Sequence, residues 1–375
     1  MDPVAPLPLL GGLSPAQFMR RHWQKKPLLV RQAWPGVAPP LPRAELFALA
    51  GSQDVESRLV QQGPKGWKLR RGPLPRRALP AVAAPRWTLL VQGLDLHVPA
   101  AHAMLAPFGF VPHARLDDLM LSWASDGGGV GPHVDAYDVF LVQVQGRRRW
   151  RIGPVRDPSL VPGLPLRILQ HFEPTEEWVL EPGDLLYLPP LWGHDGIADG
   201  ECMTASVGFR APHRRELARE LLGRIADALE DEDGPDPIYT DRRQPATATP
   251  GRVPDSYAGF AQAALLRLLA DPVRRDRALG EVLTEPKPRV WFDPGPEPTG
   301  QGALVLDRRS RMLYDERHVF LNGESWRAGG RDATLLRTLA DRRRLEAAER
   351  GRLSAGAREI VDEWLAAGWL HEEVP

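Results

Sequence analysis

The stretch from about residue 55 to residue 212 restricts the fold more than any other part of the sequence. It consists of short apolar segments that glycine or proline interrupts, such as WTLLVQG, DLMLSWAS, DVFLVQV, RRRWRI and MTASVGF. The whole chain holds 35 glycines and 39 prolines, which favours many short strands and turns. Short strands at this spacing are typical of antiparallel sandwiches and jelly rolls. We therefore predict a β-domain of this type.

Helical patterns lie on both sides of the β-rich stretch. Residues 1 to about 50 look helical and irregular, with Ser14 placed to cap a first helix. After residue 213, apolar residues recur at three- and four-residue intervals and predict two amphipathic helices, RRELARELLGRIADALEDED and YAGFAQAALLRLLADPVRR. A proline-rich linker follows, and then strand-like and helical segments that resemble a winged helix. We expect an α+β protein.

Composition excludes several classes of protein. The 48 basic and 48 acidic residues give a formal net charge of zero, so no global charge favours nucleic acid or membranes. Cys202 is the only cysteine, which excludes an intramolecular disulfide and a cysteine-cage zinc site. The N-terminus lacks a basic region before an apolar one, and no run of about 18 apolar residues occurs. We expect a cytoplasmic protein.

The segments after residue 213 are expected to mediate protein contacts. Two amphipathic helices appended to a β-domain often form an oligomer interface, although packing within the chain is an equally good interpretation. In the last module, Asp362 and Glu363 argue against insertion into a nucleic-acid groove. We therefore expect a homodimer and no direct nucleic-acid binding.

The strongest chemical signal is GPHVDAYDVFLVQVQGRRRWRIG, residues 131–153. His133 and Asp135 are two residues apart, so on an extended segment both side chains point to the same face. An imidazole and a carboxylate placed in this way can bind one metal ion, although H-x-D also occurs by chance. His194, just beyond the predicted strand LLYLPP, is the favoured third ligand, and His171 is its main rival. Two histidines and one carboxylate form the ligand set of Fe(II) oxygenases.

The segment RRRWRI contains a second signal. Strand alternation places Arg147, Arg149 and Arg151 on one face and Arg148 on the other, together with Trp150 and Ile152. Three arginines on one face require solvent, so Arg148 is expected to point inward. A buried guanidinium is costly unless it is paired, and an anionic ligand with a carboxylate would pair with it. The alternative is an arginine that extends its charge to the rim of the domain.

Turn signals predict how the ligands come together. Gln145-Gly146 predicts a turn that closes a β-hairpin, and Pro182-Gly183 predicts a turn before a buried strand. Pro189-Pro190 then ends this strand and places His194 at its end. The site is therefore expected in a jelly roll and not on helices.

At these residues the sequence resembles the Jumonji-C oxygenases of the cupin superfamily. Within them it resembles the bacterial ribosomal oxygenases that hydroxylate an arginine of large-subunit ribosomal protein sixteen. The matching stretches are residues 131–153, EPGDLLYLPP with the following histidine, and SVGFRAP. The resemblance implies a double-stranded β-helix (jelly-roll) catalytic domain with an N-terminal helical extension in residues 1–212. It further implies a helical dimerisation segment in 213–278 and a winged-helix-like domain in 279–375.

The resemblance also implies a ligand set and its cofactors. Fe(II) would be bound by His133, Asp135 and His194, and 2-oxoglutarate and O2 would be the co-substrates. Arg148 would bind the distal carboxylate of 2-oxoglutarate, where many relatives have a lysine. The residues Trp192 and Gly193, directly before His194, depart from the family pattern, which puts the rim of the pocket in doubt.

Two further residues receive roles from the resemblance. Ser122 would assist the distal carboxylate through its hydroxyl. Tyr137 would form a wall of the substrate pocket, and ordinary core packing is an equally good interpretation. The leading hypothesis is a protein hydroxylase of a ribosomal protein. A histidinyl hydroxylase, a demethylase and a non-catalytic cupin binding module are the alternatives.

Overall fold

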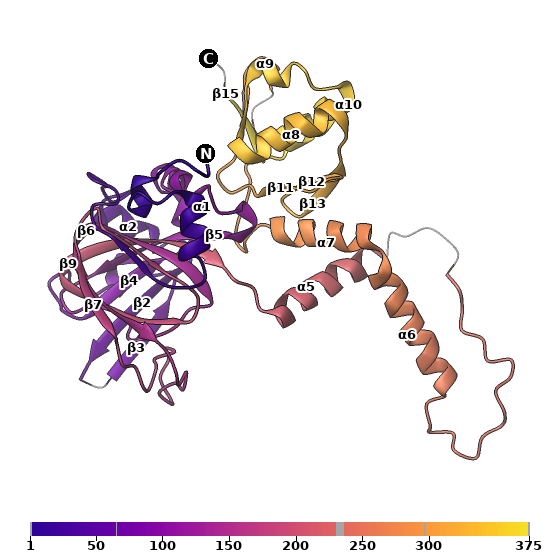
Figure 1. Cartoon of the computed structure of the whole chain (residues 1–375), viewed down its shortest axis with the longest axis horizontal. Coiled ribbons are helices and arrows are strands. Elements are labelled where there is room, and N and C mark those ends of the chain that lie inside the picture. Colours follow the sequence, from indigo (N-terminus) through magenta and orange to yellow (C-terminus); the bar gives the residue numbers. More distant parts are fainter. Residues whose placement is uncertain (1, 65, 230–235, 296–297, 374–375) are drawn as a thin grey trace. The chain divides into compact units, whose positions relative to one another are not determined.

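The computed structural model describes residues 2–64, 66–229, 236–295 and 298–373. The chain divides into two compact units, Met1–Pro212 and His213–Pro375, which Figure 1 shows in indigo to magenta and in orange to yellow. Within the described part of the chain, no helix is both long enough and apolar enough to cross a bilayer.

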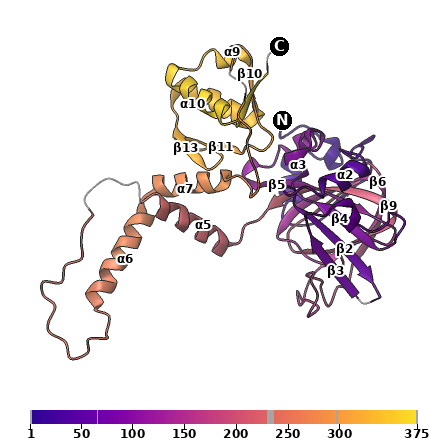
Figure 2. The same cartoon turned by 180° about the vertical axis from the view of Figure 1, so that it is seen from behind.

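A nine-stranded sheet forms the framework of the first unit, in the order β1-β8-β6-β9-β5-β4-β2-β3, with β7 paired to β6. All of its pairings are antiparallel, as the apolar segments predicted. Figure 2 shows β2, β3 and β4 side by side. The strands are β1 (Leu28–Val30), β2 (Ser57–Gly63), β3 (Gly66–Arg71), β4 (Trp87–Val91), β5 (Leu116–Ala124), β6 (Tyr137–Pro154), β7 (Glu176–Leu180), β8 (Leu185–Leu188) and β9 (Trp192–Arg210).

The long strands β6 and β9 pair along almost their whole length and join the two halves of the sheet. The first half of β6 also pairs with β8, and its second half pairs with β7. The predicted hairpin turn at Gln145-Gly146 is wrong, because both residues lie inside the continuous strand β6. The pairing with β9 is irregular there, and Gly146 adopts φ +62°. A β-bulge uses the same positive-φ glycine as a turn, so sequence alone does not separate the two.

Short helices pack one face of the sheet. Ser14 caps α1 (Pro15–Arg21) in a capping box with Gln17, as its position predicted. Phe18 of α1 is fully buried and meets the ring of Tyr187 on β8 edge-on, with 4.9 Å between ring centroids. This contact holds the N-terminal segment on the sheet. The remaining helices of the unit are α2 (Arg43–Leu49), α3 (Leu94–His97), α4 (Pro99–Ala103) and the 3-10 helices η1 (Pro8–Leu10), η2 (Arg76–Ala78), η3 (Ala106–Phe108) and η4 (His113–Arg115).

The opposite, inner face of the sheet holds a smaller apolar cluster. We call it the inner cluster, and it consists of Leu141, Trp150, Ile152, Leu180, Leu186 and Leu188. The first face of β6 instead contributes Phe140, Val142 and Val144 to the main core. The six members of the inner cluster come from β6, β7 and β8, so this face of the sheet can hold buried side chains.

The second unit begins with three helices, α5 (Arg214–Asp227), α6 (Asp255–Ala270) and α7 (Pro272–Thr284). The predicted second helix is broken in two, because Asp271 caps a new helix at Pro272. Two three-stranded sheets and three helices follow, formed by β10 (Ala303–Leu306), β11 (Met312–Tyr314), β12 (His318–Leu321), β13 (Glu324–Arg327), α8 (Gly330–Arg342), β14 (Arg344–Leu345), α9 (Ala347–Arg350), α10 (Ala355–Ala366) and β15 (Leu370–Glu373). The expected boundary between residues 278 and 279 falls inside α7, and the division of this unit into two domains stays a prediction.

The bulge in β6 yields a stability prediction. A Cβ on Gly146 would lie 2.1 Å from the carbonyl oxygen of Glu201, so Gly146→Ala adds a backbone clash to the strain of a positive φ. We expect a loss of unfolding free energy of roughly 3 kcal/mol. Gly200→Ala is the matched control, because Gly200 has φ +78° but a Cβ there would meet no atom within 4 Å. It should cost only about 1 kcal/mol in a urea unfolding experiment. Equal losses would contradict the bulge geometry.

Candidate metal centre

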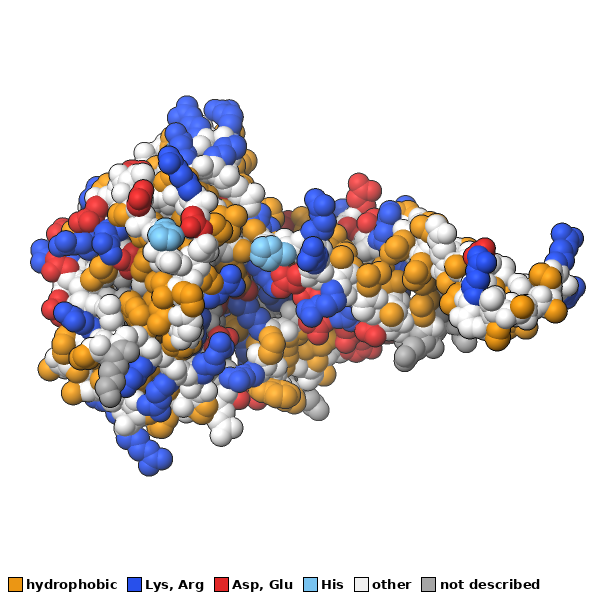
Figure 3. Space-filling view, turned by 90° about the horizontal axis from the view of Figure 1, so that it is seen from below, with side chains coloured by type: hydrophobic (Ala, Val, Ile, Leu, Met, Phe, Trp, Pro, Cys, Tyr) orange, Lys and Arg blue, Asp and Glu red, His pale blue; other side chains and the backbone are white. Residues whose placement is uncertain are grey.

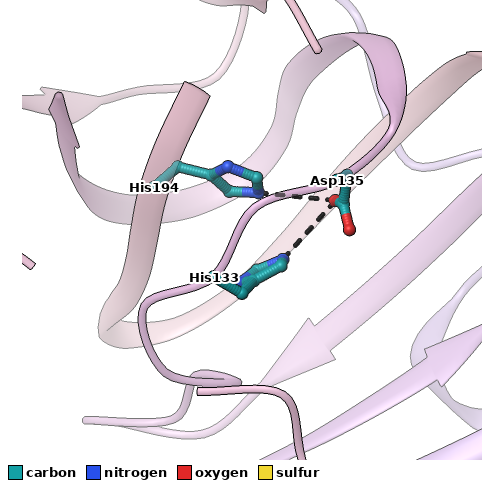
Figure 4. Close-up of side chains that lie close together, drawn as sticks. All are labelled: His133, Asp135 and His194. Carbon is teal, nitrogen blue, oxygen red and sulfur yellow. Dashed lines mark ion pairs between the residues drawn. The ribbon is translucent and has the colours of Figure 1, made fainter. Parts of the chain in front are cut away.

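Three side chains from two separate segments converge at one end of the inner face. His133 lies before β6 and His194 near the start of β9, and the backbones of the two residues exchange hydrogen bonds of 3.0 Å in both directions. The carboxylate of Asp135 lies 3.5 Å from Nε2 of His133 and 3.6 Å from Nε2 of His194. Figure 4 shows both rings pointing at this carboxylate. Backbone pairing thus holds the two imidazoles beside each other.

The second nitrogen of each imidazole is held by the local backbone. Nδ1 of His133 lies 2.9 Å from the carbonyl oxygen of Gly131, and Nδ1 of His194 lies 3.0 Å from that of Trp192. A carbonyl oxygen can only accept, so each Nδ1 must donate its proton. In the neutral imidazole this leaves the lone pair on Nε2, which is the atom that faces Asp135. This tautomer is the one in which a histidine binds a metal through Nε2.

The charges of the cluster are strongly coupled. Burial opposes protonation of His133, but the hydrogen bond and charge of Asp135 outweigh it and raise the pKa of His133 above its ordinary value. Burial and the neighbouring His133 lower the pKa of His194 to about 4. Burial also acts against ionisation of Asp135, yet the hydrogen bond and charge of His133 place the pKa of Asp135 well below its usual range. The carboxylate of Asp135 therefore lies close to both imidazoles, and His194 stays neutral near pH 7.

The spacing and donor types fit one metal ion. Two donors that bind an ion at about 2.1 Å each lie at most about 4.2 Å apart, and both distances to Asp135 meet this limit. All three donor atoms lie within 4.8 Å of one another. His194 is buried, whereas the side chain of Asp135 is 48% exposed, so the cluster is open on one side. The rival ligand His171 is exposed, in the loop before β7.

Arg148 lies on the inner face of β6, as the alternation of RRRWRI predicted. It is buried, whereas Arg147, Arg149 and Arg151 face outward and pair with acidic residues. Those partners, in the same order, are Asp199, Glu177 and Asp195. Arg148 instead has only neutral partners: Nη1 donates to Oγ of Ser122 at 2.9 Å, and Nη2 donates to the carbonyl oxygen of Gly196 at 3.2 Å.

The guanidinium of Arg148 has unused binding capacity. Its Nε is buried and has no hydrogen-bond partner among the described residues. Burial lowers the pKa of Arg148 from its ordinary value, which reflects the cost of holding this charge away from water. Within the described ranges no carboxylate forms an ion pair with it. A bound anion would offset this cost and satisfy the free donor.

Trp150 lies between Arg148 and the histidines on the inner face. The Arg148 guanidinium is 5.2 Å from the ring centroid of Trp150, and Trp150 is 6.0 Å from the ring of His194. Ile152 pairs with His194 across the two strands. Arg148 lies four residues before Ile152, which is a distance of about 13 Å along β6. A small ligand with a carboxylate at its far end could therefore reach from the histidine cluster to Arg148.

Several residues near the site had no sequence signal that identified them. Thr204 of β9 receives a hydrogen bond from Nη1 of Arg148 at 3.4 Å. Gly196 leaves no room for a side chain, since a Cβ would lie 2.7 Å from the Trp150 ring. Arg58 of β2 contributes positive charge that lowers the pKa of Asp135. Threonine, glycine and single arginines occur throughout the chain, so residue type did not mark these three as site residues. They could have been found only if the register of the strands had been known.

Ser122 and Tyr137 make different contacts in the structure. Ser122 contacts Arg148 directly and donates to the carbonyl oxygen of Thr204 at 3.3 Å. The Tyr137 ring packs on Gly208 of β9, and its hydroxyl donates to Asp117 at 2.9 Å. Burial and Asp117 raise the pKa of Tyr137, so the hydroxyl stays protonated.

Two family models match the chain. A JmjC domain covers residues 103–217, which include the histidine cluster and Arg148. A ROXA-like winged helix covers residues 267–371. The chain is 36% identical to the ribosomal protein uL16 3-hydroxylase of Escherichia coli K12 over 320 aligned residues. The alignment covers 82% of this chain and 84% of that protein. Human ribosomal oxygenase 1 is 30% identical over 204 residues, 48% of this chain and 30% of that protein.

Solved structures agree with the sequence matches. The X-ray structure of Escherichia coli YcfD superposes with a TM-score of 0.84 at 30% identity, covering 96% of this chain and 98% of that one. YcfD in complex with cobalt and 2-oxoglutarate, described as a ribosomal oxygenase, gives a TM-score of 0.79 at 32% identity over 96% and 99% of the two chains. The predicted jelly-roll and winged-helix architecture is thereby confirmed. The chain belongs to the ribosomal oxygenase family of JmjC-domain enzymes.

Proposed function

We propose that this enzyme is an Fe(II)- and 2-oxoglutarate-dependent protein hydroxylase that acts on an arginine side chain of large-subunit ribosomal protein uL16 (protein sixteen). One observation supports the proposal most strongly. The histidine–aspartate cluster lies on the same face of the sheet as Arg148, whose guanidinium is buried and has a donor without a hydrogen-bond partner among the described residues. The relatives support the ribosomal substrate, since the Escherichia coli protein is named for hydroxylation of uL16. The arginine target rests on the family resemblance.

In this proposal His133, Asp135 and His194 hold the iron. Hydrogen bonds from both Nδ1 atoms to backbone carbonyls orient the rings, so little reorganisation is needed for Nε2 to bind. Asp135 supplies the negative charge that makes a hard divalent cation favourable. When bound, the iron supplies the activation of O2 for hydroxylation, with 2-oxoglutarate converted to succinate and CO2.

Arg148 and Ser122 bind the distal carboxylate of 2-oxoglutarate. The burial of Arg148 excludes water from this contact, which strengthens the charge-assisted hydrogen bonds. Ser122 Oγ accepts from Arg148 and so fixes the direction of the guanidinium. The exposed edge of Asp135 marks the side on which a protein substrate would approach. We propose Tyr137 as a wall for the substrate side chain. We also propose that the protein is cytoplasmic, because its proposed substrate is a ribosomal protein.

We further propose that the helical segment forms a homodimer. Helix α6 has no buried residue, although it is rich in alanine and leucine. Large apolar side chains are exposed on α5 and α6, namely Leu222, Tyr257, Phe260, Leu265, Leu266 and Leu269. Figure 3 shows apolar side chains gathered over the helical segment. Several large apolar side chains exposed along one helix are typical of a protein interface, and a second copy of the same helix offers a matching surface.

The hydroxylation itself gives the first functional prediction. Incubation of purified ribosomal proteins with the enzyme, Fe(II) and 2-oxoglutarate should add the mass of one oxygen to uL16, on an arginine in the fragment spectrum. His133→Ala should abolish the product, because it removes a metal ligand. Arg148→Ala should chiefly raise the KM for 2-oxoglutarate, by roughly 100-fold for a lost charge-assisted contact of about 3 kcal/mol.

Other products would change the assignment. Loss of a methyl group would identify a demethylase, and oxygen on a histidine would identify a histidinyl hydroxylase. If wild-type enzyme binds metal but never consumes 2-oxoglutarate, the binding-module alternative would replace the enzyme.

Metal affinity gives the second functional prediction. We expect His194→Ala to weaken binding of Co²⁺ at least about 100-fold in a calorimetric titration, because a whole ligand is lost. His171→Ala should leave the affinity unchanged, since this histidine is exposed in a loop. The opposite ranking of the two variants would make His171 the third ligand.

The oligomeric state gives the third functional prediction. Leu265→Glu places a charge on the apolar face of α6 and should shift the mass in light scattering from dimer to monomer. Ala263→Glu adds the same side chain about 160° away around the helix, at least about 60° from each exposed apolar residue of α6 named above, and should preserve the dimer. Monomeric wild-type protein at micromolar concentration would refute the interface.

A further inference from the structure

Three consecutive arginines occupy positions 147–149, yet only the middle one faces the inner side. Before them, the odd-numbered Leu141 belongs to the inner cluster and the even-numbered Val142 to the main core. After them, the even-numbered Trp150 and Ile152 belong to the inner cluster. Odd-numbered residues of β6 therefore face inward before the arginines, and even-numbered residues face inward after them. We call this odd or even numbering of the inward residues the parity of a strand. Strict alternation from Leu141 would have turned Arg147 and Arg149 inward and Arg148 outward.

The change of parity comes from the bulge. Gln143 pairs with Thr204 and Gln145 pairs with Met203, so two steps along β6 match one step along β9. One extra residue in a strand reverses the facing of every side chain after it. The pairing shifts again between Gln145 and Arg147, where two steps along β6 match four steps along β9, from Met203 to Asp199. Two extra residues leave the parity of β9 unchanged, and the even-numbered Ala198 and Thr204 both lie beside Arg148. The bulge on β6 alone thus decides that Arg148 enters the site.

The side chain of Gln143 braces this bulge from within. Its Nε2 donates to the carbonyl oxygens of Gln145 at 2.9 Å and Gly146 at 3.3 Å. These two carbonyls belong to the bulged residues, and regular pairing with β9 is interrupted there. Gln143 is completely buried, so water cannot replace its donor. A buried carbonyl without a donor costs about 1–3 kcal/mol, so the two hydrogen bonds from this amide stabilise the bulge.

The other end of the same amide reaches Arg148 through Thr204. Arginine can only donate, so Thr204 Oγ1 accepts from Nη1 of Arg148 and must give its own proton elsewhere. It donates to Oε1 of Gln143 at 2.9 Å. The direction of the whole chain of hydrogen bonds is therefore determined, and it ends on the two bulge carbonyls. Gln143 contacts the bulge with its nitrogen and orients the partner of Arg148 with its oxygen.

We propose that Gln143 is a positioning residue for 2-oxoglutarate: it holds the bulge that selects Arg148 from three arginines and orients that arginine through Thr204. The inference rests on the proposed role of Arg148 as the carboxylate clamp. Gln143 itself touches neither metal nor co-substrate. Its loss should therefore affect the distal carboxylate of 2-oxoglutarate while leaving the histidine–aspartate cluster intact.

Direct binding to the metal-loaded enzyme tests the proposal. Gln143→Leu keeps the size of the side chain and removes both hydrogen-bonding groups. With Co²⁺ bound, we expect the Kd for 2-oxoglutarate to rise about tenfold, the effect of one or two lost hydrogen bonds. The Kd for Co²⁺ should stay within about twofold, and so should the weak affinity for pyruvate, a 2-oxo acid without the distal carboxylate. Gln145→Leu is the matched control, because the half-buried Gln145 pairs with Met203 of the main core, on the face opposite Arg148, and it should change none of these constants.

A second variant separates positioning from general damage. Thr204→Val removes only the hydroxyl that links Gln143 to Arg148, and Thr204→Ser restores it. We expect the valine variant to weaken 2-oxoglutarate like Gln143→Leu, the serine variant to bind normally, and the double variant Gln143→Leu/Thr204→Val to add little. These variants remain informative if Gln143→Leu does not fold.

Three results would overturn the inference. They are an unchanged Kd for 2-oxoglutarate in both Gln143→Leu and Thr204→Val, an equal loss for pyruvate, or additive effects in the double variant. Failure of the wild-type enzyme to bind 2-oxoglutarate would instead refute the proposed function, so the two failures are distinguishable.

Discussion

The antiparallel pairing of β6 with β9 is the interaction on which the candidate site depends. It places Arg148 of β6 beside Ser122 and Thr204 of the neighbouring strands, and it sets His194 opposite Ile152. The segment before β6 then returns to this edge, where His133 pairs by backbone with His194. Two histidines that are about 60 residues apart in the chain are thereby held together by backbone hydrogen bonds, which resist displacement better than side-chain contacts on loops.

The site holds buried polar and charged groups whose burial lowers the stability of the fold, and bound ligands can offset this loss. Burial and the neighbouring His133 lower the pKa of His194, so this imidazole is left neutral beside the carboxylate of Asp135 and ready to bind a cation. At the other end, Arg148 is buried against neutral partners, with one donor unused. In the proposed function, a cation bound at the histidine cluster and a carboxylate bound at Arg148 would offset these two costs, and a chelating dicarboxylate would link them. The unliganded fold gives up stability for this preorganisation, a common property of functional sites.

The parts of this arrangement that follow a period could be predicted from the sequence. Alternation within RRRWRI identified Arg148 as the inward arginine, and short apolar segments identified the antiparallel sheet. The bulge at Gln145-Gly146 was mistaken for a turn, because both features use a glycine at positive φ and differ only in which strand lies opposite. The same limit hid Gln143 and Thr204. Their importance comes from a cross-strand contact, and neither residue has a charge or spacing that marks it.

Residue type alone does not distinguish the arginines of β6. Arg147 and Arg149 face outward, half-exposed, beside Asp199 and Glu177, where solvent screening leaves an ion pair worth about 0–1 kcal/mol. Arg148 has the same side chain between them, but burial makes its charge costly and its donors strong. The difference is created by one extra residue in the strand. A strand with three arginines in a row therefore depends on register for its function, because any slip by one position would still bring an arginine inward but would break the geometry that joins it to Ser122 and Thr204.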